Sequence, residues 1–304
     1  MMSKTQALPE IERDAPIPTW FNVGGGADRL ARPASVEELC ACKAAEPEMR
    51  VLGDGANLLV ADEGVGELVV KLDQPVFRAV EINESTGVVR AGGGADLSKL
   101  IHACVRAGLT GIEGLIGVPA TLGGAAFMNA GGAHGQMADV VGSVHAVNTE
   151  GEIVVIPRDQ ISYAYRTSGL FDLVISEVEL QLTPGDPDAA RSRLKGIMAQ
   201  KKLTQPLAAK TCGCVFRNPV LRHGIEGVGA AHDRVSAGKL IDLAGGKGLT
   251  TGPCAVSNTH ANFIETDDTA NATDILRLIQ KVQDLVYDRY EILLETEVVV
   301  WRRS

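Results

Sequence analysis

Two glycine-rich segments contain the residues whose types and spacing suit the binding of a diphosphate or a flat ring. In residues 51–60, Gly53 and Gly55 directly follow a predicted strand, so consecutive main-chain N–H groups are available to cradle a pyrophosphate. The spacing departs from a dinucleotide-binding βαβ unit. Leu58 replaces the third glycine, and the next strand begins near Glu67, without room for a crossover helix. A tight turn that binds no ligand is the alternative interpretation.

The second segment, residues 108–131, has Pro119 followed by small residues and the pair Gly123 and Gly124. Such a backbone forms a narrow, rigid wall that suits a planar ring or a diphosphate lying against main-chain amides. A glycine-rich loop that packs only for its own sake is the alternative. The uncharged stretch 114–138 does not suit a membrane span, because its seven glycines and one proline would not sustain an apolar helix.

Short β-branched runs and two helices separate the glycine clusters, and together they predict a loop-rich α+β first half. Ser35 and Glu38 form a capping box ahead of one helix, and Asp96 caps another that ends before Gly108. The expected strands are residues 67–72, 87–90, 144–147, 153–156 and 173–182.

The Pro-, Gly- and Asp-rich segment at residues 183–188 predicts a hinge, after which a second region begins. Its longest expected helix, residues 268–290, has apolar residues at helical spacing and therefore one buried face. Further helices are expected near residues 188–202 and 236–244, with strands at residues 261–264 and 297–301.

Length, composition and charge exclude several classes of protein. The 304 residues suit two domains, and 45 % apolar with 22 % charged residues is typical of a globular chain. A net charge of −9 and only 12 aromatic residues argue against a nucleic-acid partner. No secretory segment is visible at the start. Two pairs among the six cysteines have C-x-C spacing, which fits neither zinc nor thioredoxin motifs, and nothing else implies export, so we expect reduced thiols and a cytoplasmic protein. The histidines lack metal-ligand spacing, so we expect no metal site.

Seven short blocks occur along the chain in one order. They are Phe21-Asn22-Val23-Gly24-Gly25, residues 52–60, residues 111–131, Tyr165-Arg166-Thr167-Ser168, Gly213-Cys214-Val215-Phe216-Arg217-Asn218-Pro219, His260-Ala261-Asn262-Phe263 and Leu294-Glu295-Thr296-Glu297-Val298. Together they make the chain resemble the UDP-N-acetylenolpyruvoylglucosamine reductases, which are flavoenzymes of bacterial peptidoglycan synthesis. The resemblance covers roughly residues 20–300, and seven spaced blocks are far more specific than any one of them.

The resemblance implies an α+β fold, in which an FAD-binding domain of the vanillyl-alcohol-oxidase (PCMH) type precedes a smaller α+β substrate-binding domain. The FAD-binding region would cover residues 1–185 as two α+β lobes, joined by the C-terminal strand 297–304, and the UDP-sugar domain residues 186–296. The implied reaction reduces UDP-N-acetylglucosamine enolpyruvate to UDP-N-acetylmuramate, with hydride passing from NADPH through FAD. The short connection at 183–200 indicates the branch without an extra tyrosine-bearing loop, and we expect a monomer.

Three residues match the catalytic positions of this family. Arg166 would grip the substrate carboxylate, and Glu297 would lie near the enediolate-like charge that builds there. Cys214 stands where most members carry the serine that donates a proton. A thiol has a reference pKa of about 8.5, so it is mostly protonated at neutral pH and able to donate. Without the resemblance, these residues would be interpreted as a salt-bridging arginine, a solvated carboxylate and a structural cysteine.

The resemblance also assigns residues to the two ligands. Ala56 and Ala120 replace a commoner serine and glycine, a change that is compatible with main-chain contacts to the flavin. Arg217 replaces a commoner lysine, and phosphate recognition accepts either cation. The residues implied for FAD are Gly53, Gly55, Ala56, Asn57, Leu58, Pro119, Ala120, Thr121, Gly123, Gly124 and Ala125. Those implied for the UDP-sugar are Tyr165, Lys202, Gln205, Arg217 and Asn218.

Two other functions stay open at this point. An FAD oxidase of the same superfamily with another substrate would make the blocks around Cys214, Asn218 and Glu297 coincidental. A flavin or UDP-sugar sensor without catalytic activity would follow if the cysteine at position 214 had stopped turnover.

Overall fold

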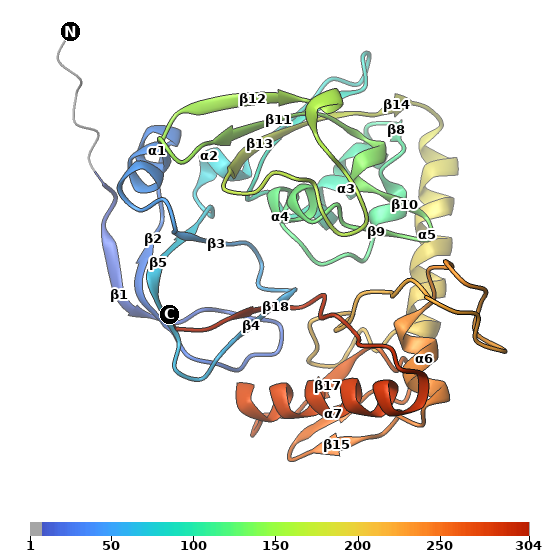
Figure 1. The fold of residues 1–304 in the computed structure, drawn as a ribbon. Coiled ribbons are helices and arrows are strands. Elements are labelled where there is room, and N and C mark those ends of the chain that lie inside the picture. The colour runs from blue at the N-terminus through green and yellow to red at the C-terminus, as the bar shows by residue number, and fades with distance from the viewer. Residues whose placement is uncertain (1–7, 304) are drawn as a thin grey trace, which may run out of the picture. The chain divides into compact units, whose positions relative to one another are not determined.

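The computed structural model describes residues 8–303, which pack as two compact units (Figure 1). Unit 1 contains residues 8–15, 27–54 and 67–201, and unit 2 contains residues 16–26, 55–66 and 202–303. These units differ from a division at residue 185. Helix α5 (Pro187–Thr204) packs mostly with unit 1, because its apolar residues Ala190 and Leu194 join the core of that unit.

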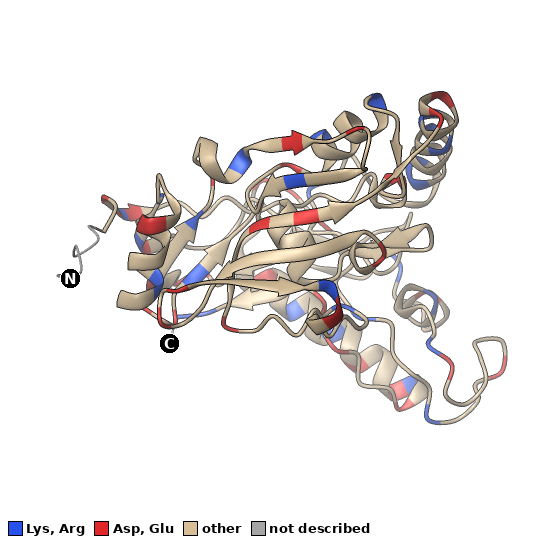
Figure 2. Ribbon diagram, turned by 90° about the horizontal axis from the view of Figure 1, so that it is seen from above, with Lys and Arg blue, Asp and Glu red and all other residues tan. Residues whose placement is uncertain are grey.

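A five-stranded antiparallel sheet forms the centre of unit 1. Its order is β12 (Ile153–Pro157), β11 (Val141–Val147), β13 (Val174–Gln181), β7 (Val88–Gly92) and β6 (Val80–Ile82). Helices α3 (Leu97–Arg106) and α4 (Leu122–Phe127) share one apolar core with this sheet (Figure 1). Charged positions occur along the strands in Figure 2. Arg90 of β7 and Glu179 of β13 form an ion pair at 2.9 Å. The alternation of apolar and charged residues therefore leaves one face of the sheet for the core.

A second sheet of unit 1 has four strands, in the order β1 (Ile11–Ala15), β2 (Ala27–Ala31), β5 (Val65–Lys71) and β3 (Arg50–Leu52). Helices α1 (Val36–Ala45) and α2 (Pro75–Arg78) belong to the same part of the chain. The predicted cap is confirmed, since the Ser35 side chain accepts a hydrogen bond from the N–H of Glu38. The Glu38 carboxylate turns to the N–H of Ala34 instead of Ser35, one residue beyond the usual capping box.

Helix α5 is fixed to the glycine-rich segment of unit 1 along its length. The buried carboxylate of Glu113 pairs with Arg193 at 2.6 Å, and Lys201 Nζ donates to the main-chain oxygen of Ile116 at 2.6 Å. The short elements in this region are β8 (Leu109–Thr110) with β14 (Thr183–Pro184), β9 (Gly131–Gly132) with β10 (Gly135–Gln136), and the 3₁₀ turns η1 (Glu113–Leu115), η2 (Met137–Asp139) and η3 (Arg158–Gln160). The predicted hinge thus becomes a strand and the start of a helix.

Unit 2 has its own apolar core beneath the longest helix. The core packs helices α6 (Ala237–Leu243) and α7 (Ala272–Tyr290) with the sheet β15 (Thr250–Thr251), β16 (Cys254–Val256) and β17 (Ile264–Thr266). The predicted buried face of α7 is confirmed by Ile275, Leu278, Ile279, Val282 and Val286. A further pair joins β4 (Leu58–Val60) in parallel to β18 (Val299–Trp301), so the end of the chain returns to an early segment.

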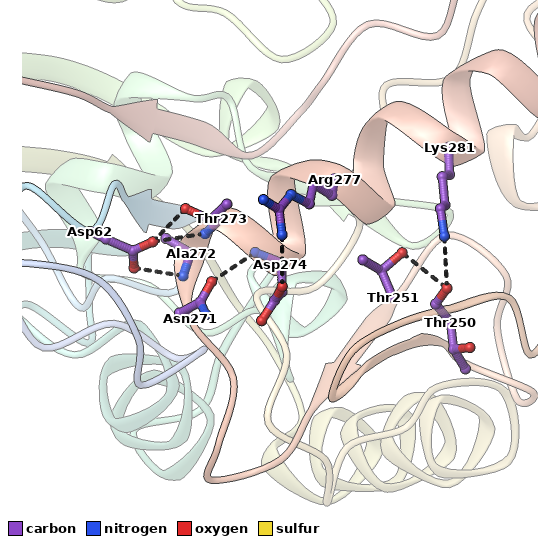
Figure 3. A network of polar contacts seen from close by, with 9 residues as sticks. All are labelled: Asp62, Thr250, Thr251, Asn271, Ala272, Thr273, Asp274, Arg277 and Lys281. Carbon is purple, nitrogen blue, oxygen red and sulfur yellow. Dashed lines mark hydrogen bonds and ion pairs between the residues drawn. The ribbon is translucent and has the colours of Figure 1, made fainter.

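The first turn of α7 is capped twice (Figure 3). Asn271 accepts the N–H of Asp274, and the carboxylate of Asp62 accepts the N–H groups of Ala272 and Thr273 at 2.8 and 3.0 Å. The Thr273 hydroxyl adds a third bond to Asp62, at 2.6 Å. A segment 210 positions earlier in the chain therefore fixes where α7 begins. In the described part of the chain, neither α7 nor any other helix combines the length and apolarity that crossing a bilayer requires.

The prediction of a strand at residues 261–264 was wrong for residues 261–263. Residues 261–263 form a turn, in which Phe263 donates to His260 and accepts from Ser257, and β17 begins only at Ile264. The reason is that Asn262 uses its side chain, rather than a strand ladder, to bond a neighbouring segment.

Not every glycine cluster faces a ligand. A Cβ added at Gly92 or Gly94 would lie 2.2 Å from the Phe77 oxygen or 1.7 Å from the Leu72 oxygen. Side chains at these positions are therefore excluded by main-chain packing inside unit 1, and the cluster at residues 92–94 gives no evidence of a ligand.

Candidate active site

The two predicted ligand-binding segments meet in unit 1. Leu97 donates its N–H to Ala120 at 3.1 Å, and Leu122 donates to Ala95 at 2.8 Å, so residues 120–122 pair with the start of α3. A Cβ added at Gly53 would lie 2.9 Å from Thr121 Oγ1. The Thr121 hydroxyl itself accepts from Gly124 and caps α4.

Main-chain donors in both segments are left for a ligand. Within residues 8–303, no acceptor is found for the N–H groups of Gly53, Asp54, Ala120 and Thr121 in unit 1, or of Gly55, Ala56 and Asn57 in unit 2. Buried main-chain N–H groups, such as those of Gly55 and Ala56, are almost always paired in folded proteins. Several N–H groups in succession form an anion-binding concavity. The N–H groups of residues 53–54 and 120–121 within unit 1 are therefore available to the phosphates of a dinucleotide cofactor, and so, within unit 2, are those of residues 55–57.

The conformation of Gly55 is also consistent with the alternative interpretation of residues 51–60 as a tight turn. Gly55 has a φ of +66°, and a Cβ there would lie 2.2 Å from the Pro18 oxygen. Leu58 is buried in β4, and Ala125 is buried in α4, where it joins the core of unit 1.

Arg166 lies in a tight turn of unit 1. Ala164 and Thr167 exchange main-chain hydrogen bonds at 2.9 and 3.3 Å, which leaves Tyr165 and Arg166 as the two residues at the tip. The φ of Arg166 is +60°, a region that non-glycine residues rarely occupy and that is enriched at functional sites. Its guanidinium donates from Nη1 to the Gly131 oxygen at 2.9 Å and lies 5.2 Å from the centre of the Tyr165 ring.

Cys214 and Glu297 come from neighbouring segments of unit 2. The Val215 oxygen accepts the N–H of Glu297 at 2.7 Å and that of Val298 at 3.3 Å, and Arg217 donates its N–H to Glu295 at 2.9 Å. These bonds place the segment after Cys214 alongside the segment that carries Glu297. The structure thus pairs the two segments that carry predicted catalytic residues, although these segments are far apart in the sequence.

Glu297 is half-buried, whereas Glu295, two residues earlier, is exposed. Asn57 holds the Glu297 segment from the other side. Its Nδ2 donates to the Glu297 oxygen at 3.0 Å, and its own oxygen accepts from Val299 at 3.1 Å. The Asn57 side-chain amide therefore has a structural role at the C-terminal strand.

Cys214 is half-buried, whereas its neighbour Cys212 is fully buried and forms no disulfide. Burial raises the pKa of the Cys212 thiol, and the nearby Cys214 and Glu297 add to that effect. Cys212 is consequently a neutral, structural thiol, and the two cysteines differ in access to a ligand.

The residues predicted for the UDP-sugar differ from one another in burial and in hydrogen bonding. Arg217 Nε is buried and has no hydrogen-bond partner among the described residues, which suits an arginine that awaits an anion. Asn218 Oδ1 accepts the N–H of Ala237 at 3.0 Å and so helps to begin α6. Lys202 is exposed on the last turn of α5, and Gln205 follows that helix and is half-buried.

Sequence reasoning missed Asn129, Lys201 and Asn262. Burial lowers the pKa of Lys201, whose ammonium contacts the glycine-rich wall at Ile116. Asn129 and Asn262 are each 3 % exposed and bond the segments that carry Arg166 and Cys214. The signal for both asparagines was their presence inside the blocks at 111–131 and 260–263, where a buried amide needs main-chain partners.

Comparison with known proteins agrees with this geometry. Residues 27–157 match the FAD binding domain family, and residues 205–301 match the C-terminal domain of UDP-N-acetylenolpyruvoylglucosamine reductase. The reductase of that name from Synechococcus sp. (strain CC9605) is 38 % identical over 288 residues, covering 92 % of this chain and 91 % of its own. The one from Wolbachia sp. subsp. Drosophila simulans (strain wRi) is 35 % identical over 285 residues, covering 93 % and 92 %.

A solved structure also agrees. The crystal structure of the reductase from Thermus caldophilus is 36 % identical to this chain and covers 96 % of it and 99 % of its own, with a TM-score of 0.80. The chain belongs to the UDP-N-acetylenolpyruvoylglucosamine reductase family. The predicted family, the α+β fold with an FAD-binding domain, the FAD cofactor and the oxidoreductase class are thereby confirmed.

Proposed function

We propose that this protein reduces the enolpyruvyl ether of UDP-N-acetylglucosamine enolpyruvate to the lactyl ether of UDP-N-acetylmuramate, with NADPH as the reductant. This would be a cytoplasmic step in the synthesis of peptidoglycan precursors. The observation that carries the proposal is the pairing of Val215 with Glu297, at 2.7 Å between N and O, because it supports a proton donor and a carboxylic acid acting on one substrate.

FAD, when bound, supplies the hydride that reaches the terminal carbon of the enolpyruvyl double bond. We assign its pyrophosphate to the unpaired main-chain N–H groups of residues 53–57 and 120–121. The glycines at 123 and 124 and the side chains of Pro119 and Ala125 would form the wall beside it.

Three side chains of this protein would then complete the reduction. As the hydride adds, negative charge moves onto the substrate carboxylate, where the Arg166 guanidinium can grip two oxygens at once. Glu297 would hydrogen-bond the same enediolate-like group. The Cys214 thiol would donate its proton to the carbon that bears the ether oxygen, which leaves a thiolate that regains a proton from solvent. Bonds to hydrogen on both carbons account for the reduction of the double bond.

The remaining polar residues would hold the UDP-sugar. Arg217 offers a charged fork whose Nε has no acceptor among the described residues, which is the chemistry that a diphosphate requires. Tyr165, at the same turn tip as Arg166, would contact the substrate close to its carboxylate. Lys202, Gln205 and Asn218 complete the assignment.

The first test is an anaerobic titration followed by visible absorbance. NADPH should bleach the flavin of the purified protein, and the enolpyruvyl UDP-sugar should restore its colour, with one equivalent of UDP-N-acetylmuramate formed. A bleached flavin that ignores this substrate while another acceptor restores it would show a different oxidoreductase. No flavin binding after reconstitution with FAD would contradict the assignment of both glycine-rich segments.

Variants of Cys214 separate the enzyme from a sensor that lacks catalytic activity. Cys214→Ala should reduce kcat by about 10²-fold or more, the usual contribution of a positioned proton donor, while Cys214→Ser should remain active. Cys212→Ser is the matched control. A wild type that is inert but gains turnover as Cys214→Ser would favour the sensor, and full activity in Cys214→Ala would remove Cys214 from the mechanism.

A further inference from the structure

We propose that Asn129 is the positioning residue of Arg166, and that it fixes the guanidinium where a substrate carboxylate binds. The inference rests on the proposed role of Arg166 in that binding. Asn129 lies in the loop between α4 and β9, with a φ of +45°, and is 3 % exposed. Its burial means that its amide must be bonded within the protein, and those bonds lead to the Arg166 turn.

The Asn129 amide joins three segments. Nδ2 donates to the Ala164 oxygen at 3.0 Å and to Gln136 Oε1 at 3.2 Å, and Oδ1 accepts the N–H of Ala138 at 3.0 Å. Both amide hydrogens and the amide oxygen are therefore used. The Ala164 oxygen, which accepts one of these bonds, belongs to the residue at which the Arg166 turn begins.

The turn needs such support because its conformation is unfavourable for an arginine. Arg166 has a φ of +60°, which carries a steric cost for any residue with a Cβ, so the surrounding structure must over-determine it. The bond from Asn129 to Ala164 holds the first residue of the turn, and the exchange between Ala164 and Thr167 closes it.

The same short segment also holds the other end of Arg166. The Gly131 oxygen accepts from Arg166 Nη1 at 2.9 Å, two residues after Asn129. A Cβ at position 131 would lie 2.5 Å from the Cβ of Gln136, so this segment lies close against β10. Residues 129–131 thus fix both the main chain and the guanidinium of Arg166. Asn129 bonds the main chain of the turn, and Gly131 accepts from the guanidinium.

Asn129→Asp is the sharpest variant. Aspartate has the shape of asparagine and keeps the oxygen that accepts the N–H of Ala138. It replaces the Nδ2 donor by a second oxygen, so the hydrogen bond to the Ala164 oxygen is lost and the two oxygens repel each other. Asn129→Gly removes the whole side chain without a charge and still accepts the positive φ. Asn148→Asp is the matched control in the same unit, because Asn148 also uses Nδ2 on Glu152 and Oδ1 on main-chain N–H groups.

The measurement compares two ligands by calorimetry on the oxidised, FAD-loaded protein. One is UDP-N-acetylglucosamine enolpyruvate, and the other is UDP-N-acetylglucosamine, which lacks the carboxylate. Both Asn129 variants should bind the carboxylate-bearing ligand about tenfold more weakly, the usual loss for a misplaced charge-assisted hydrogen bond, and bind the other as the wild type does. Asn148→Asp should bind both normally. In an Arg166→Ala background, Asn129→Gly should have no further effect on either ligand.

The outcomes separate the inference from its premise. Equal weakening of both ligands, or normal binding by both Asn129 variants while Arg166→Ala loses the carboxylate preference, would overturn the role of Asn129 alone. If Arg166→Ala keeps the full preference for the carboxylate-bearing ligand, the proposed role of Arg166 fails, and the inference fails with it.

Discussion

In unit 1, Arg166 stands at the tip of a turn that Asn129 and Gly131 hold from 35 positions away, and the unfavourable φ falls on the arginine itself. In unit 2, the positive φ falls on Gly213, which adopts it without cost, and the following residues lie in extended pairing with Asn262 and Glu297. One predicted catalytic residue is therefore held in a strained turn by a few side-chain bonds. The segments of the other two are held by main-chain pairing with distant parts of the chain, to which the side chains of Asn57 and Asn262 add hydrogen bonds.

This difference predicts where each unit is vulnerable. Strain at Arg166 lowers stability in exchange for a fixed guanidinium, so changes there should affect activity more than folding. The Cys214 segment depends on several buried hydrogen bonds to segments near the end of the chain, so changes there should affect folding first.

The largest effect should come from removing Arg166. Arg166→Ala and Arg166→Gly should both reduce kcat/KM by about 10³-fold, or about 4 kcal/mol, the loss expected for one donor to developing negative charge. The glycine variant should be more stable than the alanine variant by about 1 kcal/mol, because only glycine accepts a φ of +60° without steric cost. Urea unfolding of both variants measures this difference. Equal stability would show that the turn is not strained.

Asn262→Ala should cost unit 2 about 2–4 kcal/mol of unfolding free energy, because it leaves the buried N–H and oxygen of Phe216 without partners. Urea denaturation followed by circular dichroism measures the loss. Asn258→Ala, which changes an exposed asparagine four residues earlier, is the control and should change little. Similar stability of the two variants would mean that the Cys214 segment is not held by this amide.

Asp62→Ala should cost about 1 kcal/mol, the usual value of a helix cap, and Glu63→Ala should cost almost nothing. Burial acts to raise the pKa of Asp62, but hydrogen bonds from Thr273 and Ala272 outweigh it and lower that pKa below its ordinary value. The stabilisation is therefore present at neutral pH and is lost as the pH falls through the folded-state pKa. Unfolding midpoints at pH 7 and pH 3 should differ less in Asp62→Ala than in Glu63→Ala. If the midpoints of both variants changed equally between pH 7 and pH 3, the Asp62 carboxylate would not be a source of the pH dependence of stability.

The smallest effect should be a pH dependence specific to unit 2. His260 Nδ1 accepts the N–H of Asn262 at 3.2 Å, which requires a neutral ring. Burial, aided by Lys247, lowers the pKa of His260 below its usual 6.5. Its contribution is therefore complete above pH 6.5 and falls as the pH drops toward the folded-state pKa. His260→Gln should lose part of the acid sensitivity of unfolding, whereas the exposed His102→Gln should retain it. Identical pH profiles for the two would contradict this.

Local patterns predicted the elements well where the signal was a cap or a periodic face. Ser35, Asp96 and the apolar residues of α7 marked helices that the structure contains. Residues 261–264 failed because Asn262 turns its side chain to Phe216, a partner 46 positions away that local propensity does not reveal.

The candidate site shows the same difference between what a local pattern indicates and what distant contacts decide. Glycines at 53 and 55 indicated main-chain donors before any fold was known, and those donors have no acceptor among the described residues. The glycines at 92–94 look the same in sequence, yet they are required by packing against Phe77 and Leu72. A glycine marks close approach, and only the fold shows what approaches.

By itself the sequence determined the family, the flavin cofactor and the residue types available for the chemistry, because these depend on side-chain identity and on blocks in a fixed order. Tertiary structure alone decided that Glu297 pairs beside Cys214 and that Asn129 holds the Arg166 turn. It also decided that α5 packs mainly with unit 1. The physical reason is that buried amides and main-chain groups must find partners wherever the fold brings them, at any separation along the chain.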